Sequence, residues 1–252
     1  MKQTIIQTVS LLVASAMASN GAIVVQNFWK LGENDSPAPS NGGAGNTTTV
    51  DLQGIRNLTK DGSPTYTQTV APGSSYALAF NGSSGYSGTS VQSGVTTNFG
   101  MEIWARPTAA NQNAVLFYNG NDGANGWGIL LQNGVPTLLY GNQLIFSGGS
   151  APINQTTHIA ITRGSTGSTL YVNGVAVNTS NANNPNAPSG SVLIGRGFSG
   201  NQRFTGILDE ARIFTFNTGG FQTSDLLYAV PEPGSVTLCG LAALTLFKRR
   251  RR

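Results

Sequence analysis

The sequence predicts an all-β protein, an antiparallel β-sandwich in one domain, and three observations support this fold class. Charged residues make up only 10% of the 252 residues, whereas Gly, Asn, Ser and Thr are abundant, a composition typical of turn-rich β proteins. Short runs of β-branched and aromatic residues alternate with Gly, Asn, Pro and Ser at the spacing of a sandwich or barrel. The central region shows no convincing 3.6-residue period, so we expect little helix there.

The N-terminus has the three-part pattern of a secretory signal peptide. Met1-Lys2 supplies positive charge, residues 5–13 are mainly apolar, and Ala16-Met17-Ala18 is a small-x-small site. This order predicts cleavage by signal peptidase after Ala18, with cleavage near Ala22 as an alternative. The structural alternative for this stretch is a buried N-terminal strand or helix.

Nine later segments are predicted to be strands, because each is short, rich in β-branched or aromatic residues and bounded by turn residues. These segments are Ser75–Phe80, Phe99–Arg106, Ala114–Tyr118, Gly128–Gln132, Thr137–Tyr140, Thr157–Arg163, Thr169–Val172, Ser191–Ile194 and Gly206–Phe216.

Two Asn-Gly pairs predict tight hairpins. Asn173-Gly174 separates two apolar runs, and Asn133-Gly134 repeats the arrangement. Asn-Gly favours a two-residue turn with positive φ, and such a turn can join only antiparallel strands. An antiparallel sheet is therefore expected around both pairs.

Five segments resemble motifs of the concanavalin A-like (LamG-like) jelly roll, and together they extend over roughly residues 24–228. They are Asn27–Glu33, Met101–Pro107, Thr157–Thr162, Leu170–Gly174 and Gly206–Phe214. The chain departs from the family at Gln155-Thr156, where Trp is usual. The resemblance implies a concanavalin A-like antiparallel jelly roll.

Candidate catalytic residues are few. His158 is the only histidine and alternates with Ile159 and Ile161 in a predicted strand, which favours a structural role. Asp209 and Glu210 are the nearest approach to a carboxylate pair, but successive strand residues point to opposite faces and cannot flank one glycosidic bond. The carboxylate motif of family-16-type glycosidases is absent from the sequence. We therefore expect no enzyme activity.

Calcium is the one cofactor that the sequence suggests, because many LamG-like domains bind it and the resemblance makes Asp209 a candidate ligand. Calcium prefers carboxylate, amide and carbonyl oxygens. The alternative is that Asp209 only caps or hydrogen-bonds a neighbouring loop. Residues 119–123 look like a calcium loop but contain one carboxylate where an EF-hand loop has several, so we interpret them as a turn.

The three tryptophans are candidates for stacking on sugar rings. Trp104 lies in a predicted strand, and the family resemblance makes it a core residue. Trp127 lies beside loops rich in Asn and Gly, and we name it as the candidate ligand contact.

The basic balance of the chain comes from its ends. Lys2 and residues 248–252 supply 6 of the 14 cations, and residues 19–230 hold 8 cations against 9 anions. Nucleic-acid binding needs a basic stripe on the fold itself, so it is not expected. The single cysteine, Cys239, lies in the C-terminal apolar run, which excludes a disulfide or thiolate metal site in the predicted domain.

The C-terminus has three parts: Val230-Pro231-Glu232-Pro233, the uncharged residues 234–247, and the cations Lys248, Arg249, Arg250, Arg251 and Arg252. As a helix, the uncharged part would span about 21 Å, against a hydrocarbon core of about 30 Å. The cations would stay on the cytoplasmic side. This pattern favours transient inner-membrane retention, and an uncut tail anchor is the alternative.

The same C-terminal pattern resembles the PEP-CTERM sorting domain of Gram-negative bacteria. The resemblance implies recognition by an exosortase, cleavage near Pro231-Glu232-Pro233, and delivery to the cell envelope or extracellular matrix. We accordingly divide the chain into a signal peptide (1–18), one LamG-like domain (19–229) and a sorting and membrane-anchor signal (230–252).

The functional hypothesis is an exported, non-catalytic protein whose LamG-like domain binds extracellular polysaccharide or acts in adhesion. One alternative is a protein–protein interaction or structural module of the same fold. The other is a carbohydrate-active enzyme with an unrecognised site.

Overall fold

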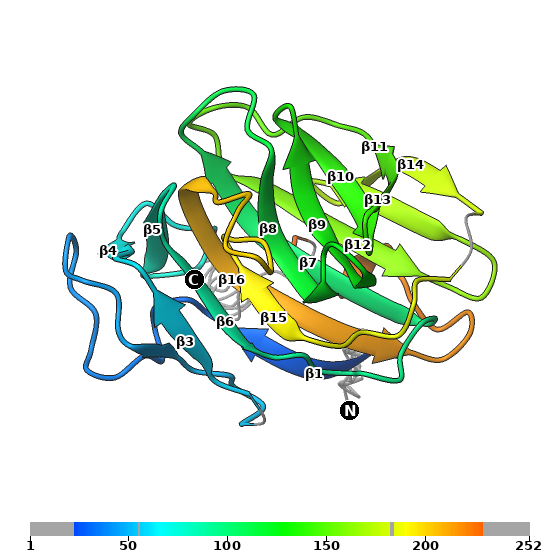
Figure 1. Cartoon of the computed structure of the whole chain (residues 1–252), viewed down its shortest axis with the longest axis horizontal. Coiled ribbons are helices and arrows are strands. Elements are labelled where there is room, and N and C mark those ends of the chain that lie inside the picture. The colour runs from blue at the N-terminus through cyan, green and yellow to red at the C-terminus, as the bar shows by residue number, and fades with distance from the viewer. Residues whose placement is uncertain (1–22, 55, 182–183, 229–252) are drawn as a thin grey trace, which may run out of the picture.

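The computed structural model describes residues 23–54, 56–181 and 184–228, which form two antiparallel sheets stacked face to face (Figure 1). Sheet A has the strand order β14 (Val175–Ser180), β13 (Ser168–Val172), β12 (Thr157–Arg163), β7 (Phe99–Pro107), β16 (Thr205–Phe216), β5 (Ala77–Asn81) and β4 (Thr65–Thr67), and β1 (Ile23–Trp29) also pairs with β16. Sheet B has the order β11 (Gln143–Ser147), β10 (Val135–Tyr140), β9 (Asn125–Gln132), β8 (Ala114–Asn121), β15 (Ser191–Ile194), β6 (Gly85–Thr89), β3 (Leu58–Asp61) and β2 (Thr48–Thr49).

This architecture confirms the predicted all-β sandwich. Within the described residues the only helix is the short 3-10 helix η1 (Thr223–Asp225), and no helix there is long and apolar enough to cross a membrane. The predicted signal peptide and the predicted sorting signal lie outside the described residues.

The core lies between the sheets and follows from the two-residue period of the strands. In β12, Ile159 and Ile161 point inward, whereas His158 and Ala160 point to the outer face of sheet A. In the core, the rings of Phe99 (β7) and Trp127 (β9) stack across the two sheets with centroids 4.0 Å apart. Burying one such apolar side chain stabilises the fold by about 1.5–3 kcal/mol.

Both predicted Asn-Gly hairpins are confirmed. Asn133 and Gly134 have φ of 50° and 80°, and Asn173 and Gly174 have φ of 50° and 75°. The flanking strands pair directly across each turn, β9 with β10 and β13 with β14. Asn and Gly tolerate this left-handed conformation, which matches the twist of the two strands.

A different segment of the chain packs on the outer face of each sheet. Residues 217–228 lie on the outer face of sheet A, where Phe221 and Leu226 pack with Tyr171, Phe214 and Phe216. On the outer face of sheet B a second apolar cluster, formed by Val115, Tyr118, Leu130, Leu139 and Leu193, lies beneath the 195–204 segment. A hydrogen bond from the Val115 N–H to the Gln202 carbonyl (2.9 Å) fastens this segment to β8.

Candidate functional site

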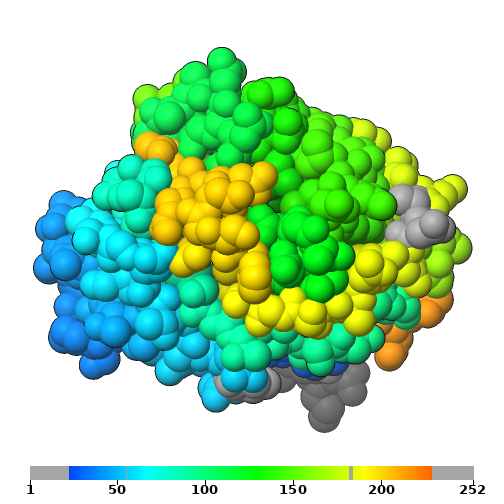
Figure 2. All heavy atoms as spheres, viewed as in Figure 1, coloured from blue at the N-terminus to red at the C-terminus, as the bar shows by residue number. Residues whose placement is uncertain are grey.

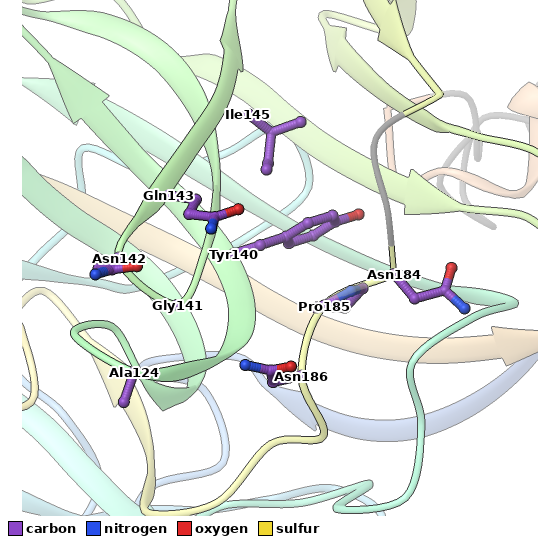
Figure 3. A pocket seen from close by; sticks show the side chains of 9 residues that line it. All are labelled: Ala124, Tyr140, Gly141, Asn142, Gln143, Ile145, Asn184, Pro185 and Asn186. Carbon is purple, nitrogen blue, oxygen red and sulfur yellow. The ribbon is translucent and has the colours of Figure 1, made fainter.

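Two hollows lie where the β8–β9 turn and the β10–β11 turn meet at one end of sheet B. The first has a volume of about 430 Å³ and is lined by Ala124, Tyr140, Gly141, Asn142, Gln143, Ile145, Asn184, Pro185 and Asn186 (Figure 3). The second has about 330 Å³ and is lined by Asp122, Gly123, Leu130, Gln132, Leu139, Asn142, Leu144, Ser199, Asn201 and Gln202. Figure 2 shows this face, with the green 120–145 region beside the yellow and orange 185–203 region.

The two hollows lie on opposite faces of the β10–β11 hairpin, because alternate strand residues point to opposite sides. Tyr140 and Ile145 belong to the inner, core-facing side and line the first hollow. Leu139 and Leu144 point to the outer side and line the second. Asn142, at the tip of the hairpin, is exposed and lines both hollows.

The Tyr118 hydroxyl joins the two turns. It accepts a hydrogen bond from the Gly141 N–H (2.8 Å) and donates one to the Asn125 carbonyl (3.0 Å). Burial raises the pKa of Tyr118 well above its usual value, so its proton is present at any ordinary pH. The turns also touch through their backbones, since a Cβ at Gly141 would lie 2.9 Å from the Ala124 carbonyl.

The far wall of the first hollow is the 184–186 segment, which two hydrogen-bonded groups hold in place. The buried Arg163 donates from Nε (3.0 Å) and Nη2 (2.6 Å) to Oδ1 of Asn184. The Gly126 N–H donates to the Asn186 carbonyl (3.0 Å). Both contacts come from strands of the sandwich, so the wall is fixed by the fold itself.

Tyr140 forms the floor of the first hollow, with its ring between the β10–β11 turn and the 184–186 segment (Figure 3). Its hydroxyl lies 2.6 Å from the Ser168 hydroxyl. Burial raises the pKa of Tyr140 to about 12, although the Ser168 hydrogen bond and the Arg163 charge act in the opposite direction. The floor is therefore uncharged at neutral pH.

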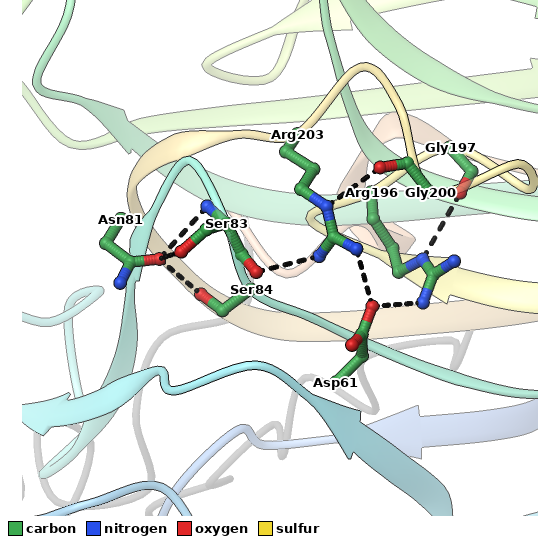
Figure 4. Close-up of polar contacts among 8 residues, drawn as sticks. All are labelled: Asp61, Asn81, Ser83, Ser84, Arg196, Gly197, Gly200 and Arg203. Atoms are coloured by element: carbon green, nitrogen blue, oxygen red, sulfur yellow. Dashed lines mark hydrogen bonds and ion pairs between the residues drawn. The ribbon is translucent and has the colours of Figure 1, made fainter.

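The 195–204 segment, which borders the second hollow, is held by an ion cluster on its other side (Figure 4). Arg203 donates to Asp61 Oδ2 (2.6 Å) and to the Ser83 carbonyl (3.0 Å), and Arg196 contacts the same Asp61 oxygen. The hydrogen bond from Arg203 and the charges of both arginines lower the pKa of Asp61. Slight burial acts in the opposite direction. On the hollow side, Asp122 accepts the Phe198 N–H (2.8 Å).

The chemistry of the lining suits a neutral, hydroxyl-rich ligand. Asn and Gln side chains line both hollows, and each amide can donate and accept hydrogen bonds. Asp122 is the one charged side chain among the lining residues. Hollows of about 300–1,000 Å³ are typical of small-ligand sites.

A sequence model of the concanavalin A-like lectin/glucanases superfamily matches residues 81–217. The chain belongs to this superfamily. No curated protein matches the sequence.

Solved structures share the superfamily fold at low sequence identity. Domain 4 of AbnA, an extracellular arabinanase of Geobacillus stearothermophilus in complex with arabinotriose, has a TM-score of 0.62 and 19% identity, and the match covers 82% of this chain and 98% of that domain. The sialidase of Trypanosoma rangeli in complex with the inhibitor DANA has a TM-score of 0.54 and 15% identity over 81% of this chain and 33% of the sialidase. The binding domain of Paraclostridial mosquitocidal protein 1 has a TM-score of 0.54 and 17% identity over 74% of this chain and 50% of that domain. At these identities the likeness shows the fold.

The structure contradicts the ligand contact predicted for Trp127. Its side chain is fully buried between the sheets, stacks on Phe99, and donates from Nε1 to the Val95 carbonyl (3.0 Å). The flanking glycines suggested a loop, but residues 125–132 form β9, and Trp127 shares the inward face with Ile129 and Leu131. Its indole therefore presents no face to a ligand.

His158 and Trp104 lie together in a buried polar cluster on the outer face of sheet A. Glu102 lies at the centre of this cluster. Its Oε2 lies 2.8 Å from His158 Nε2, and its Oε1 accepts a hydrogen bond from Arg212 Nε (2.5 Å). The Leu227 N–H also donates to Oε2 (2.9 Å), and Tyr228 packs against Trp104 and His158. Trp104 is buried as predicted, but it lies beneath Tyr228 on the outer face of sheet A and outside the core between the sheets.

The pKa of Glu102 results from opposing influences. Burial alone would raise it, but the Arg212 charge, the His158 contact and the Leu227 N–H outweigh burial and hold it below the ordinary value. Glu102 is therefore ionised at neutral pH. Glu102 and His158 are fully buried, so neither is exposed to a substrate in this structure.

Asp209 is buried, and one of its oxygens has no partner among the described residues. Oδ2 accepts the Ala71 N–H (2.9 Å), whereas Oδ1 is unpartnered, as is Oε2 of nearby Glu33. Burial, with the charges of Glu210 and Glu33, raises the pKa of Asp209. Such oxygens fit the donor chemistry that calcium prefers. However, the described residues contain no group of three or more His, Cys, Asp or Glu side chains able to hold a metal ion, so calcium at Asp209 stays a prediction.

Sequence reasoning missed the residues that line the hollows. Asn142, Gln143, Asn184 and Asn186 come from two turns that are distant in the sequence. The available signal was the density of Asn and Gln in loops that flank strongly predicted strands. Asn is abundant throughout this chain, however, and the signal alone could not single out these loops.

Proposed function

We propose that the chain is an exported bacterial protein of the cell envelope or extracellular matrix whose β-sandwich binds neutral polysaccharide without catalysis. The observation that carries this proposal is the pair of amide-lined hollows at one end of sheet B. Sugar hydroxyls both donate and accept hydrogen bonds, and uncharged amides match both roles. Membership of the lectin/glucanases superfamily and the arabinotriose-bound fold relative agree with a sugar ligand.

The lining also supports a non-catalytic role. Glycoside hydrolysis in most families needs two carboxyl groups on opposite sides of the scissile bond. The residues around the two hollows include a single carboxylate, Asp122, and it is already hydrogen-bonded to the Phe198 N–H. We therefore propose recognition of the sugar as the function of the site.

The proposal on export rests on the sequence of the two ends. The N-terminal pattern before Ala18 suits signal peptidase, and Pro231-Glu232-Pro233 with its apolar run and cations suits an exosortase. In this proposal the tail holds the protein briefly at the inner membrane before transfer to the envelope or matrix. Mass spectrometry of the mature protein from its native host tests it, and a C-terminus that still ends in the arginine cluster would contradict exosortase cleavage.

Binding to a glycan array, with calcium and with a chelator, tests the proposed ligand class. We expect binding to one or more neutral polysaccharides and weaker binding in Ala124→Trp, which fills the first hollow. Ser63→Trp, on an exposed turn of another part of the molecule, is the matched control. Silence on every glycan would favour a protein–protein interaction module, and release of reducing sugar would favour an enzyme.

A further inference from the structure

Resting on the proposed function, we propose that the two hollows are consecutive subsites for one linear, uncharged polysaccharide chain that crosses the β10–β11 turn at Asn142. The two hollows share this single residue, which lies at the tip of the hairpin. A sugar unit in each hollow would be linked over the tip, with the Asn142 amide between them. The ligand class is therefore a chain of at least two units.

The tip of the β10–β11 hairpin, where the chain would cross, is open to solvent and carries little side-chain bulk. Asn142 and Gln143 are exposed, Leu144 is 50% exposed, and Gly141 has no side chain to block the passage. Gly141 has φ of 55° and lies against the Ala124 backbone, so the tip is both narrow and tightly seated. A polysaccharide backbone can bend over such a tip without displacing a side chain of the core.

The two subsites are held in a fixed relation before any ligand arrives. The Tyr118 hydroxyl is hydrogen-bonded to both the β8–β9 turn and the β10–β11 turn. The β8–β9 turn lines the first hollow with Ala124 and the second with Asp122, and the β10–β11 turn carries Asn142. The outer wall of the second hollow is fastened separately, by Asp122 to the Phe198 N–H and by Val115 to the Gln202 carbonyl. A fixed spacing lowers the entropic cost of binding a chain at two points.

Both subsites combine the two kinds of surface that a sugar can contact. The first hollow offers amides, from Gln143 and Asn186 among others, to the hydroxyl groups, and the Tyr140 ring as an apolar floor. The second also offers amides, and adds the apolar side chains of Leu139 and Leu144, against which the C–H face of a sugar ring can pack. The one charge at the site is negative, Asp122, which disfavours an anionic chain.

Titration calorimetry with the full chain tests the two-subsite arrangement. The probes are cello-, xylo-, manno- and arabino-oligosaccharides from one to six units, with alginate oligosaccharides as the anionic counterpart. For the sugar that binds, we expect the dissociation constant to fall at least about tenfold between one unit and four, which corresponds to about 1.4 kcal/mol. Further units should add little, because both hollows are then filled.

Variants assign the effect to each hollow. Ala124→Trp fills the first hollow and Ser199→Trp the second, and each should reduce the affinity for a four-unit chain to that for one unit; Ser63→Trp is the matched control. Asn142→Ala should weaken the four-unit chain about threefold or more and a single unit much less, with the exposed Asn217→Ala as its control. If a tryptophan variant unfolds, Gln143→Ala and Gln132→Ala replace it for the first and second hollow, with smaller expected losses.

The outcomes separate the two proposals. Binding by wild type that is independent of chain length, or unaffected when the second hollow is filled, would overturn the two-subsite arrangement and leave the proposed function standing. Tighter binding of alginate than of every neutral oligosaccharide would overturn the uncharged ligand class. If no oligosaccharide and no polysaccharide binds, the proposed function fails, and the two subsites fail with it.

Discussion

The outer face of sheet A and the hollowed end of sheet B use polar residues in opposite ways. On sheet A, the charged groups Glu102 and Arg212 are buried and in contact, and residues 217–228 cover them. On sheet B, uncharged amides are left open to solvent around two hollows. A buried charge demands its partners because leaving it unpaired is costly, whereas an exposed amide can exchange water for a ligand. The first arrangement suits closure of the fold, and the second suits recognition.

The sharpest test of this contrast is Glu102→Gln, which removes the charge but keeps the shape. Because Arg212 would remain buried without its counter-charge, we expect the free energy of unfolding to fall by about 3–5 kcal/mol, measured by urea denaturation. Binding of polysaccharide per folded molecule should not change. The control is Asp61→Asn, whose carboxylate is 40% exposed and screened by water, with an expected loss of at most about 1 kcal/mol. Equal losses in both variants would contradict the distinction.

Tyr118→Phe tests whether the end of sheet B is organised for binding. The substitution leaves the Asn125 carbonyl without the hydroxyl donor and removes one acceptor of the Gly141 N–H, so we expect a stability loss of about 1–2 kcal/mol. The loss of affinity should be greater for a four-unit oligosaccharide than for one unit, because the two turns would no longer be fixed together. A uniform loss at every chain length would argue against this positioning role.

Acid titration separates two buried carboxylates with opposite pKa shifts. The lowered pKa of Glu102 means that its contribution to stability is present above the unfolded value and is lost as the pH falls through the folded value. The raised pKa of Asp209 means the reverse: stability declines as the pH rises from the unfolded value, 3.8, through the raised one. Asp209→Asn should therefore abolish this decline in a chelator. Urea denaturation across the acid range measures both effects, and an unchanged profile in Asp209→Asn would contradict the second.

Calcium gives the smallest expected effect and tests the remaining prediction for Asp209. If an ion satisfies the unpartnered oxygens, wild type should melt at a higher temperature in calcium than in chelator, and Asp209→Asn should lose this difference. At an ion concentration equal to the dissociation constant, binding would add about 0.4 kcal/mol. Equal melting temperatures in wild type with and without the ion would rule out this role for Asp209.

Much of the fold was predictable because the strongest strands carry their own signal. Thr157–Arg163 and Ser191–Ile194 were predicted with the bounds that the structure shows. Ile159 and Ile161 fit a two-residue period in the first, and the second contains a short continuous apolar run, residues 192–194. The short strands β3 and β6 were missed, because β6 contains two glycines and β3 ends in charged residues. They are strands because neighbours distant in the sequence supply their hydrogen-bond partners, as β15 does for β6.

The candidate site was much harder to predict than the fold. The two-residue period of β9 places Trp127 on the same inward face as Ile129. The sequence therefore contained enough information to avoid predicting Trp127 as a ligand contact. By contrast, the meeting of Asn142 with Asn184 and Asp122 depends on the order of the strands in sheet B and on the path of two loops. Local patterns do not contain that information.

The position of Tyr228 sets the direction in which the domain would be presented. This residue packs against Trp104 and His158 on the outer face of sheet A, whereas the hollows open at the end and outer side of sheet B. If the chain is tethered to a surface through the segment that follows, as the proposed sorting signal would require, the sandwich stands between the tether and the hollows. The proposed sugar site would then face outward, toward neighbouring cells or the surrounding matrix.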